Sequence, residues 1–143
     1  MIELNSKTKK DFLGREWMEK LIEAGIDTDG KYVIGKDGLS KNDDNPDTTD
    51  YVWYKDSVAH IYNVCPTFTV SELLHKLQGY IYPTIEGTQY HGSLHLMKDV
   101  PYYPVYYMLM DDEGNKNTHL RADFESPIES LAALLILCHK HGI

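Results

Sequence analysis

The fold of this chain is decided by residues 126–143, SPIESLAALLILCHKHGI, at its C-terminal end. Ser126 is a candidate N-cap, Pro127 suits the first helical position, and Glu129 stands where a capping box requires it. Apolar residues then cover almost every side of the helix until Gly142 supplies a C-terminal stop. Because a helix that is apolar nearly all round needs burial nearly all round, this helix is predicted to be central to the core.

Two further helices are predicted upstream of this segment. The first begins after Asn5 or Ser6 and runs to about Ala24, where Gly25 is a good terminator. The second covers residues 69–79 and opens on the capping box TVSE. The apolar face of the first helix is formed by Phe12, Leu13, Trp17, Met18, Leu21 and Ile22.

Short aromatic and β-branched runs between turn residues predict antiparallel strands elsewhere. They are residues 32–34, 51–64 with a break, 80–85, 93–97, 105–110 and 116–121, with Glu86-Gly87 as the turn after 80–85. The sum is an α+β fold, in which an antiparallel sheet of four to six strands packs against three helices in a single globular domain, residues 1–143. Residues 40–50, SKNDDNPDTTD, contain no apolar side chain and are predicted to be a solvated loop that folding does not require.

Composition narrows the partners that the chain is expected to have. The formal net charge is −8, from 22 acidic and 14 basic residues, so no net positive field attracts nucleic acid or an anionic membrane. Cys65 and Cys138 are expected to be reduced thiols, with a disulfide between them as the alternative. Residues 1–17 lack the apolar core of a signal peptide, and no apolar run reaches the roughly 18 residues of a membrane span. A cytoplasmic location is therefore expected.

Tyrosines are the most distinctive feature of the composition, with eleven in the chain and four in the segment PYYPVYYM. Alternation along a strand at 102–110 separates its side chains into two faces. The face with Val105 and Leu109 fits the core better, because aliphatic side chains leave no hydroxyl to satisfy. Pro101 and Pro104 favour an edge strand. The opposite face is predicted to be a binding surface, made by Tyr102, Tyr106, Met108 and Met110. The alternative is that the tyrosines only line a half-buried sheet.

No motif in the chain indicates catalysis, a cofactor or a metal. His91 and His95 share a strand face but stand about 13 Å apart, and the seven histidines lack ligand spacing to any cysteine or carboxylate. The acidic residues at 43–50 and 111–113 do not follow the calcium-loop pattern and fit turns and solvating charge. No G-x-S-x-G, P-loop or G-x-G-x-x-G occurs, so the chain is expected not to be an enzyme. An active site assembled from scattered residues stays as an alternative.

Three stretches of the chain share their order and spacing with a known group of proteins. They are WMEKLIEAGIDTDGKYV at 17–33, TFTVSELLHKLQGYI at 67–81 and the closing SPIESLAALLILCHKHGI. In these stretches the chain resembles a group of small uncharacterised proteins encoded by tailed bacteriophages and prophages of gut bacteria. The resemblance implies a setting, the bacterial cytoplasm during infection or lysogeny, and it implies no catalytic residue.

The leading functional expectation is a non-enzymatic phage or prophage accessory protein that acts by protein–protein binding. Its partner is an unidentified host or phage protein, or a second copy of the chain. The alternative is a small-ligand or nucleotide binder with a pocket lined by tyrosines, in which Lys98 and Arg121 are the nearby cations for phosphates. Purification from host lysate would separate the two. A stoichiometric protein that co-purifies would support protein binding, whereas nucleotide absorbance retained by the purified chain would support the ligand binder.

Overall fold

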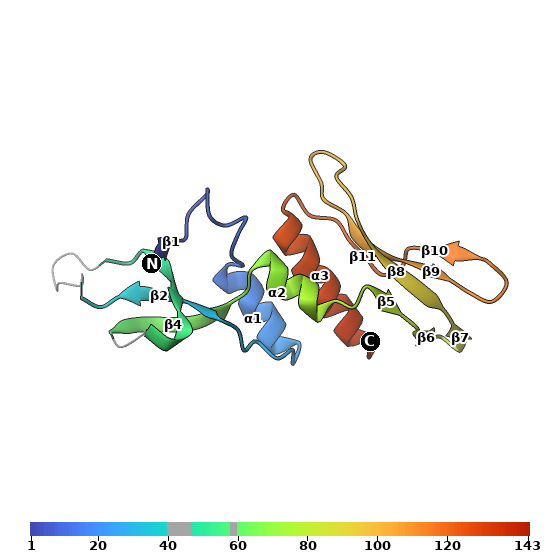
Figure 1. Ribbon diagram of the computed structural model, residues 1–143, viewed down its shortest axis with the longest axis horizontal. Coiled ribbons are helices and arrows are strands. Elements are labelled where there is room, and N and C mark those ends of the chain that lie inside the picture. The colour runs from blue at the N-terminus through green and yellow to red at the C-terminus, as the bar shows by residue number, and fades with distance from the viewer. Residues whose placement is uncertain (40–46, 58–59) are drawn as a thin grey trace. The chain divides into compact units, whose positions relative to one another are not determined.

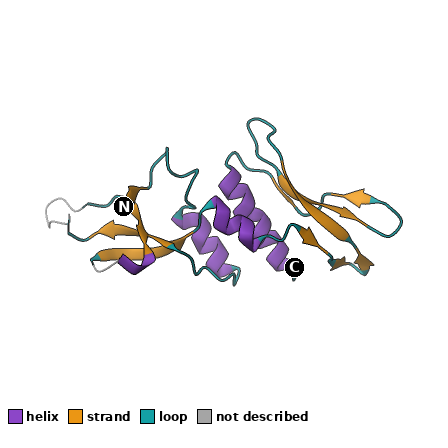
Figure 2. Cartoon of the chain, viewed as in Figure 1, coloured by secondary structure: helices purple, strands orange, loops and turns teal. Residues whose placement is uncertain are grey.

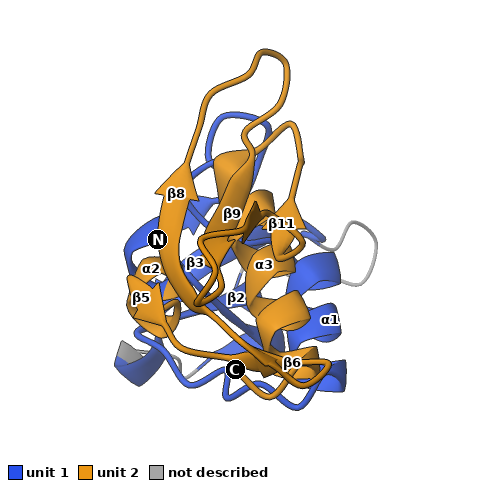
Figure 3. Cartoon of the chain, turned by 90° about the vertical axis from the view of Figure 1, so that its right-hand side faces the viewer, with its two compact units in different colours: residues 1–72 blue, residues 73–143 orange. Residues whose placement is uncertain are grey.

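The computed structural model describes residues 1–39, 47–57 and 60–143, which form two compact units. Unit 1 is Met1–Glu72 and unit 2 is Leu73–Ile143 (Figure 3). Helices and antiparallel strands occur in both units (Figure 2), so the predicted α+β class is confirmed. The strands form two principal sheets, however, where the sequence suggested one. The expectation of a single domain stays a prediction.

Unit 1 contains a four-stranded antiparallel sheet of order β1-β3-β2-β4 (Figure 1). Its elements are β1 (Ile2–Glu3), β2 (Tyr32–Asp37), β3 (Asp50–Tyr54), the short 3-10 helix η1 (Lys55–Ser57) and β4 (Ile61–Thr67). The strand expected at 51–64 is therefore two strands, and β2 is longer than expected. The register of β2 against β4 shifts between Ile34 and Lys36. Gly35 lies at this shift, where the Ile61 side chain occupies the space that a Cβ would need.

The first helix of unit 1, α1 (Arg15–Glu23), begins later than the sequence suggested. Residues 5–11 form turns instead, because the Asn5 side-chain oxygen accepts hydrogen bonds from the backbone N–H groups of Lys7 at 2.9 Å and Thr8 at 3.3 Å. Such local bonds offer the backbone an alternative to the helical ladder. The prediction of a helix from residue 6 was therefore wrong by more than two turns.

The buried face of α1 is also narrower than the predicted apolar face. Met18 and Leu21 are fully buried, but Ile22 is 50% exposed. Phe12 and Leu13 are buried as predicted, although they precede the helix. Gly25 ends the helix with a φ of 82°, which confirms its role as a left-handed terminator.

The second helix, α2 (Val70–Lys76), begins in unit 1 and continues into unit 2. Its predicted capping box is present. The Glu72 backbone N–H donates to the Thr69 hydroxyl at 3.2 Å, and the Thr69 N–H donates to the Glu72 carboxylate at 3.0 Å. These bonds give partners to two backbone N–H groups at the helix start that have no acceptor within the helix, as the sequence pattern TVSE indicated.

Unit 2 contains a five-stranded antiparallel sheet of order β10-β9-β8-β5, in which β11 also pairs with β9. A separate two-stranded hairpin joins β6 to β7. Pro83 follows β5, so the strand expected at 80–85 is divided into two short pieces. Glu86 and Gly87 have positive φ, which makes them the hairpin turn expected there. The strands are β5 (Tyr80–Ile81), β6 (Thr84–Ile85), β7 (Thr88–Gln89), β8 (His91–Leu96), β9 (Val105–Met110), β10 (Lys116–Asn117) and β11 (Arg121–Ala122).

The C-terminal helix, α3 (Pro127–Lys140), packs against β9 and β11 (Figure 1). Between Ile128 and Cys138 every apolar side chain is buried or half-buried, as predicted for a helix without a polar face. Gly142 has a φ of 71°, and the Ile143 N–H donates to the Cys138 carbonyl at 3.0 Å, which confirms the predicted stop. Within the described part of the chain, none of the helices has the length and apolar character of a membrane span.

The N-terminal cap of α3 differs from the prediction. Ser126 has the extended N-cap backbone, but its hydroxyl makes no capping bond and is buried without a hydrogen-bond partner. The nearby Ser130 hydroxyl instead accepts the Phe124 N–H at 3.0 Å, which binds the preceding segment to the first turn. The predicted capping box at residues 126–129 was therefore wrong, while Pro127 stands at the helix start as expected.

Candidate functional site

The sheet of unit 2 has two faces with different roles. Val105, Tyr107 and Leu109 point to the α3 side and are each about 1% exposed. Burial beside Cys138 of α3 raises the pKa of the Tyr107 phenol, and its hydroxyl donates to the Gln78 carbonyl at 2.5 Å. Because side chains alternate along a strand, Tyr106, Met108 and Met110 of β9 point to the opposite side. This side is called the outer face, and Figure 3 shows α3 behind the strands that carry it.

Strand register assembles the outer face from residues far apart in the sequence. Side chains directly opposite each other on paired strands lie on one face. Register therefore sets three rows across the sheet: Tyr80–Ser93–Met108, His91–Met110–Lys116 and His95–Tyr106–Arg121. Each row crosses three strands, so the chemistry of this face depends on how the strands pair.

The third row is a packed aromatic and cationic stack. The His95 ring lies parallel to the Tyr106 ring, with centroids 5.3 Å apart and an interplanar angle of 7°. The Arg121 guanidinium lies 5.6 Å from the Tyr106 centroid and pairs with Asp123 through contacts of 2.8 and 3.1 Å. The Tyr106 hydroxyl donates to the Met97 sulfur at 3.2 Å. This row is held in place from both neighbouring strands.

The first two rows border a groove of about 590 Å³, a size common among ligand sites. Tyr80 and Tyr82 are each 72% exposed at one side, and Lys116 lies on β10 at the other. No aspartate or glutamate of the described residues lines the groove, although unit 2 carries eight acidic against five basic residues. The lining residues are Tyr80, Tyr82, His91, Gly92, Ser93, His95, Met108, Met110 and Lys116.

Two of the four predicted binding residues lie in this groove. Met108 and Met110 are half-buried there, on the face that alternation assigned to them. Tyr106 lies on the same face but is only 8% exposed, because His95 and Arg121 cover it. The expectation that Tyr106 is freely exposed was therefore wrong.

Tyr102 lies apart from the groove. It is 47% exposed in the connection between β8 and β9, where its backbone pairs with Asp99. The predicted strand from residue 102 therefore begins three residues later, at Val105. The expectation of an edge strand was also wrong, because β9 lies between β8 and the pair β10 and β11. The two prolines precede the strand and remove no hydrogen bond from its ladder.

The connection between β8 and β9 presents a further apolar surface, which is called the tip. Its exposed apolar side chains include Met97 at 49%, Val100 at 74% and Tyr102 at 47%. The hydrogen bond from Tyr106 to Met97 joins the tip to the third row of the outer face. Scattered apolar residues are ordinary on protein surfaces, whereas a large contiguous apolar patch is typical of interaction sites.

Sequence reasoning missed most of the groove. The alternation of histidine, serine and histidine in HGSLHL, residues 91–96, was a usable signal, because a period of two places His91, Ser93 and His95 on one face. Tyr80, Tyr82 and Lys116 had no such signal, since only the pairing of β5 with β8 and of β10 with β9 brings them to this face.

The groove also contains a serine and a histidine in contact, with Ser93 Oγ and His95 Nε2 3.0 Å apart. Hydrolytic serine–histidine pairs add a carboxylate that orients the imidazole and donors that bind an oxyanion. No carboxylate from residues 1–39, 47–57 or 60–143 lines this groove, and the His95 ring is stacked on Tyr106. Among the described residues, no group of three or more potential ligands could hold a metal ion. In the described part of the chain, the Ser93–His95 pair therefore lacks the carboxylate of a hydrolytic site.

Neither cysteine has the character of a nucleophile. Both are free thiols, so no disulfide joins them. Burial raises the pKa of the Cys138 thiol to about 11 and raises the pKa of Cys65 as well. A raised pKa keeps both thiols protonated and unreactive near neutral pH.

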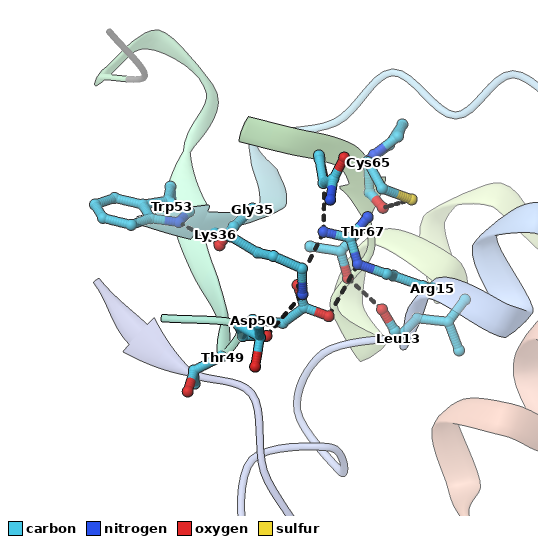
Figure 4. A network of polar contacts seen from close by, with 12 residues as sticks. Leu13, Arg15, Gly35, Lys36, Thr49, Asp50, Trp53, Cys65 and Thr67 are labelled. Atoms are coloured by element: carbon cyan, nitrogen blue, oxygen red, sulfur yellow. Dashed lines mark hydrogen bonds and ion pairs between the residues drawn. The ribbon is translucent and has the colours of Figure 1, made fainter. Parts of the chain in front are cut away.

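A polar network in unit 1 is the other concentration of charged groups (Figure 4). Arg15 of α1 donates two hydrogen bonds of 2.9 Å to Asp50, and Lys36 of β2 donates to Asp50 at 3.0 Å. Arg15 also donates to the Asn63 carbonyl of β4. Burial alone would raise the pKa of Asp50, but the bonds from Arg15 and Lys36 outweigh it, so the pKa is lower than usual.

This network holds the sheet and helix of unit 1 together, and its partners are all engaged with one another. It also corrects the prediction for residues 40–50. Residues 40–46 lie outside the described residues, but Asp50 begins β3 as a half-buried ion-pair acceptor rather than a solvated loop residue. Asp47 is anchored as well, since it accepts hydrogen bonds from Tyr51 and Tyr62. The composition of residues 40–50 did not predict these contacts.

Comparisons with known proteins return no match: no protein-family model, curated protein sequence or solved structure is significantly similar to this chain.

Proposed function

We propose that this chain is a non-enzymatic binding protein and that the outer face of unit 2 receives a partner protein. The observation that carries the proposal is the groove, where exposed tyrosines lie beside the half-buried methionines of β9 and no carboxylate of the described residues lines the site. Tyrosine and methionine are enriched at protein interfaces. Methionine adapts its shape to a partner, whereas tyrosine provides a rigid apolar body with a polar end.

The arrangement of the site supports binding by a preformed surface. Met108 and Met110 lie on β9, the central strand of the sheet, and the third row is fixed by its ring stacking and its ion pair. A site on regular elements loses less conformational freedom when a partner binds than a site on loops does. The tip, which follows β8, carries further exposed apolar side chains.

The proposal includes the setting that the sequence resemblance implies. In that setting, the chain is a phage or prophage accessory protein in the cytoplasm of a bacterial host, and its partner is a host or phage protein. A second copy of the chain is the other form of protein partner.

A second candidate function is binding of a small planar ligand such as a nucleotide. One observation favours it: the groove is concave and offers aromatic rings beside a cation, with Tyr80 and Tyr82 on one side and Lys116 on the other. Stacking on an aromatic side chain contributes about 1–3 kcal/mol per base. Lys116 is the lysine that lines the groove, whereas Lys98, named as a candidate from the sequence, does not line it.

Variants of the groove test the proposed function. Tagged wild-type protein, Tyr80→Ala and Met108→Ser would each be used to capture partners from a bacterial lysate, and Tyr54→Ala would serve as control. Tyr54 is an equally conspicuous tyrosine in unit 1, 67% exposed. The proposal expects a stoichiometric protein that both groove variants lose and the control retains.

Two other results would change the conclusion. A protein that both groove variants retain would place the binding surface elsewhere. Nucleotide absorbance released from wild-type protein, and lost in the groove variants, would favour the second candidate. Sedimentation of the purified protein would show whether the partner is a second copy.

A further inference from the structure

We propose that the segment bound on the outer face is an extended, acidic peptide that carries an apolar or aromatic anchor side chain. This inference rests on the proposed function and specifies the chemistry of the partner. Three observations carry it: the composition of the groove, the sign of the charges around it, and the length of the exposed apolar surface.

The groove suits an apolar anchor. Met108 and Met110 stand on the sheet, and Tyr80 and Tyr82 stand beside them with most of their rings exposed. An anchor side chain that enters between tyrosines and methionines loses its water and gains contacts on several sides, which is how interface hot spots arise. Thioethers also make favourable contacts with aromatic rings.

The formal charge on the described lining of the groove is positive. Within the part of the chain that the structure describes, its ionisable lining comprises Lys116, His91, His95 and the two tyrosines, without a carboxylate. Lys116 is exposed and has no ion-pair partner among the described residues. Because unit 2 is acidic as a whole, the positive charge here is local, and an acidic segment complements it. A basic segment would instead meet the like charge of Lys116.

The exposed apolar surface is longer than the groove. Beyond Tyr106, which is only 8% exposed, the tip adds the exposed side chains of Met97, Val100 and Tyr102, and the Tyr106 hydroxyl donates to the Met97 sulfur. The six residues of β8 span about 20 Å, at roughly 3.3 Å per residue. An extended peptide of about six to eight residues matches this length, whereas a single nucleotide would cover only the groove.

A single-stranded nucleic acid would match the length but not the charge. Such ligands carry a phosphate on every nucleotide and are held in grooves that follow the backbone with positive charge. Here Lys116 lies at one side of the groove, and Arg121 is already paired with Asp123. The balance of eight acidic and five basic residues in unit 2 opposes a polyanion, whereas a few carboxylates on a short peptide need only local complementarity.

Synthetic peptides of about eight residues test this inference by titration into the ¹⁵N-labelled chain. One peptide has a central tryptophan flanked by glutamates. Matched peptides carry glutamine or lysine as flanks, and another has glutamate flanks around alanine. We expect the glutamate–tryptophan peptide to shift amide signals of β8, β9 and β10 and to bind at least about fivefold more tightly than the other three. Its affinity should fall as ionic strength rises from about 50 to about 300 mM.

A charge reversal then tests the assigned cation. Lys116→Glu should weaken this peptide at least about fivefold. Lys140→Glu, at the exposed C-terminal end of α3, should leave the affinity unchanged and serves as the matched control. Amide spectra of both variants would establish that the fold is intact before affinities are compared. A second reversal, Lys116→Asp, would replace Lys116→Glu if that variant were misfolded.

Several outcomes would overturn the inference, and they differ from failure of the proposed function. Equal binding of the glutamine- or lysine-flanked peptide at the outer face would refute the acidic character, while leaving that face as the binding site. Tighter binding of an oligothymidylate of about eight nucleotides, or of uridine monophosphate, would identify a nucleic acid or a free nucleotide instead. Absence of any peptide-induced shift at millimolar concentration would refute the peptide class. A lysate partner indifferent to Tyr80→Ala and Met108→Ser would refute the proposed function itself.

Discussion

The helices α1 in unit 1 and α3 in unit 2 each pack on an antiparallel sheet, but they differ in chemistry. α1 buries Met18 and Leu21, exposes most of its remaining residues, and connects to its sheet through the ion pair between Arg15 and Asp50. α3 has no charged residue between Glu129 and His139 and exposes none of its apolar side chains.

The difference shows how the surroundings of a helix decide which forces hold it. A helix with a wide solvent-facing side carries charged residues, and those near its ends are available to pair with the sheet. A helix buried nearly all round depends on apolar packing. In unit 2 the outer face of the sheet carries Arg121, which pairs with Asp123, and Lys116, which forms no ion pair among the described residues.

Truncating a buried leucine of α3 is expected to cause the largest loss of stability. It tests whether apolar packing holds this helix in place. Leu134→Ala removes a side chain with no exposed surface and should lower the free energy of unfolding by about 2–5 kcal/mol. Leu135→Ala, at a position 9% exposed, should cost an amount in the same range or slightly less. Urea unfolding would measure both, with Ile22→Ala of α1 as the exposed control. Equal losses for Leu134→Ala and Ile22→Ala would contradict the dominant role of α3.

Removing the charge of Asp50, the acceptor of the unit 1 network, tests how much the ion pairs of this network stabilise the protein. Asp50→Asn should destabilise the protein by about 1–3 kcal/mol at neutral pH, because it weakens charge-assisted bonds from Arg15 and Lys36. Asp123→Asn, which loses an exposed pair with Arg121, should cost no more than about 1 kcal/mol. Unfolding free energies at pH 7 would compare the two variants, and a larger loss for Asp123→Asn would contradict the proposed role of the network.

The effect of Asp50→Asn on stability should depend on pH. The folded pKa of Asp50 lies below its ordinary value of 3.8, so the carboxylate stabilises the folded state above pH 3.8. This stabilisation is lost as the pH falls through the lower folded pKa. The stability gap between wild type and Asp50→Asn should therefore shrink below pH 3.8. A gap that stays constant down to about pH 2 would show that Asp50 acts through packing and not through its charge.

A glycine on β8 tests how closely unit 2 packs its inner face. A Cβ at Gly92 would lie 2.7 Å from Leu109 Cδ2 and 3.1 Å from Ile81 Cγ1, so Gly92→Ala should cost about 1–3 kcal/mol through overpacking. A Cβ at Gly79 would meet no atom within 4 Å, and Gly79→Ala should change stability by no more than about 0.5 kcal/mol. Melting temperatures would separate the two variants. Equal melting temperatures would show that the inner face has room to adjust.

The smallest effect on stability is expected on the outer face, where the effect on binding should be largest. Tyr82→Ser removes a ring that is 72% exposed and should change the free energy of unfolding by no more than about 0.5 kcal/mol. Denaturant unfolding measures this change, and Tyr106→Ala is the contrasting variant, because its ring is covered by His95 and Arg121. A large destabilisation by Tyr82→Ser would show that this tyrosine belongs to the core and not to a binding surface.

Local patterns in the sequence were sufficient for several features of the structure. The capping box of Thr69 and Glu72 formed as predicted, because its bonds join residues three apart. Burial of α3 followed from the absence of polar residues along it, and the inner face of β9 followed from the alternation of Val105, Tyr107 and Leu109. Each of these features depends on neighbours within one element, where spacing in the sequence fixes spacing in space.

The tertiary structure alone decided which elements meet. Pairing of β9 with β8, β10 and β11 placed it inside the sheet, covered Tyr106 with His95 and Arg121, and brought Lys116 to the groove. In unit 1 the fold joined Asp50 to Arg15, 35 residues away, and made an ion-pair acceptor from a residue of an apparently solvated loop. Such contacts depend on strand order and register, which result from competition among many non-local pairings. The periodicity of a single segment therefore does not predict which strands pair.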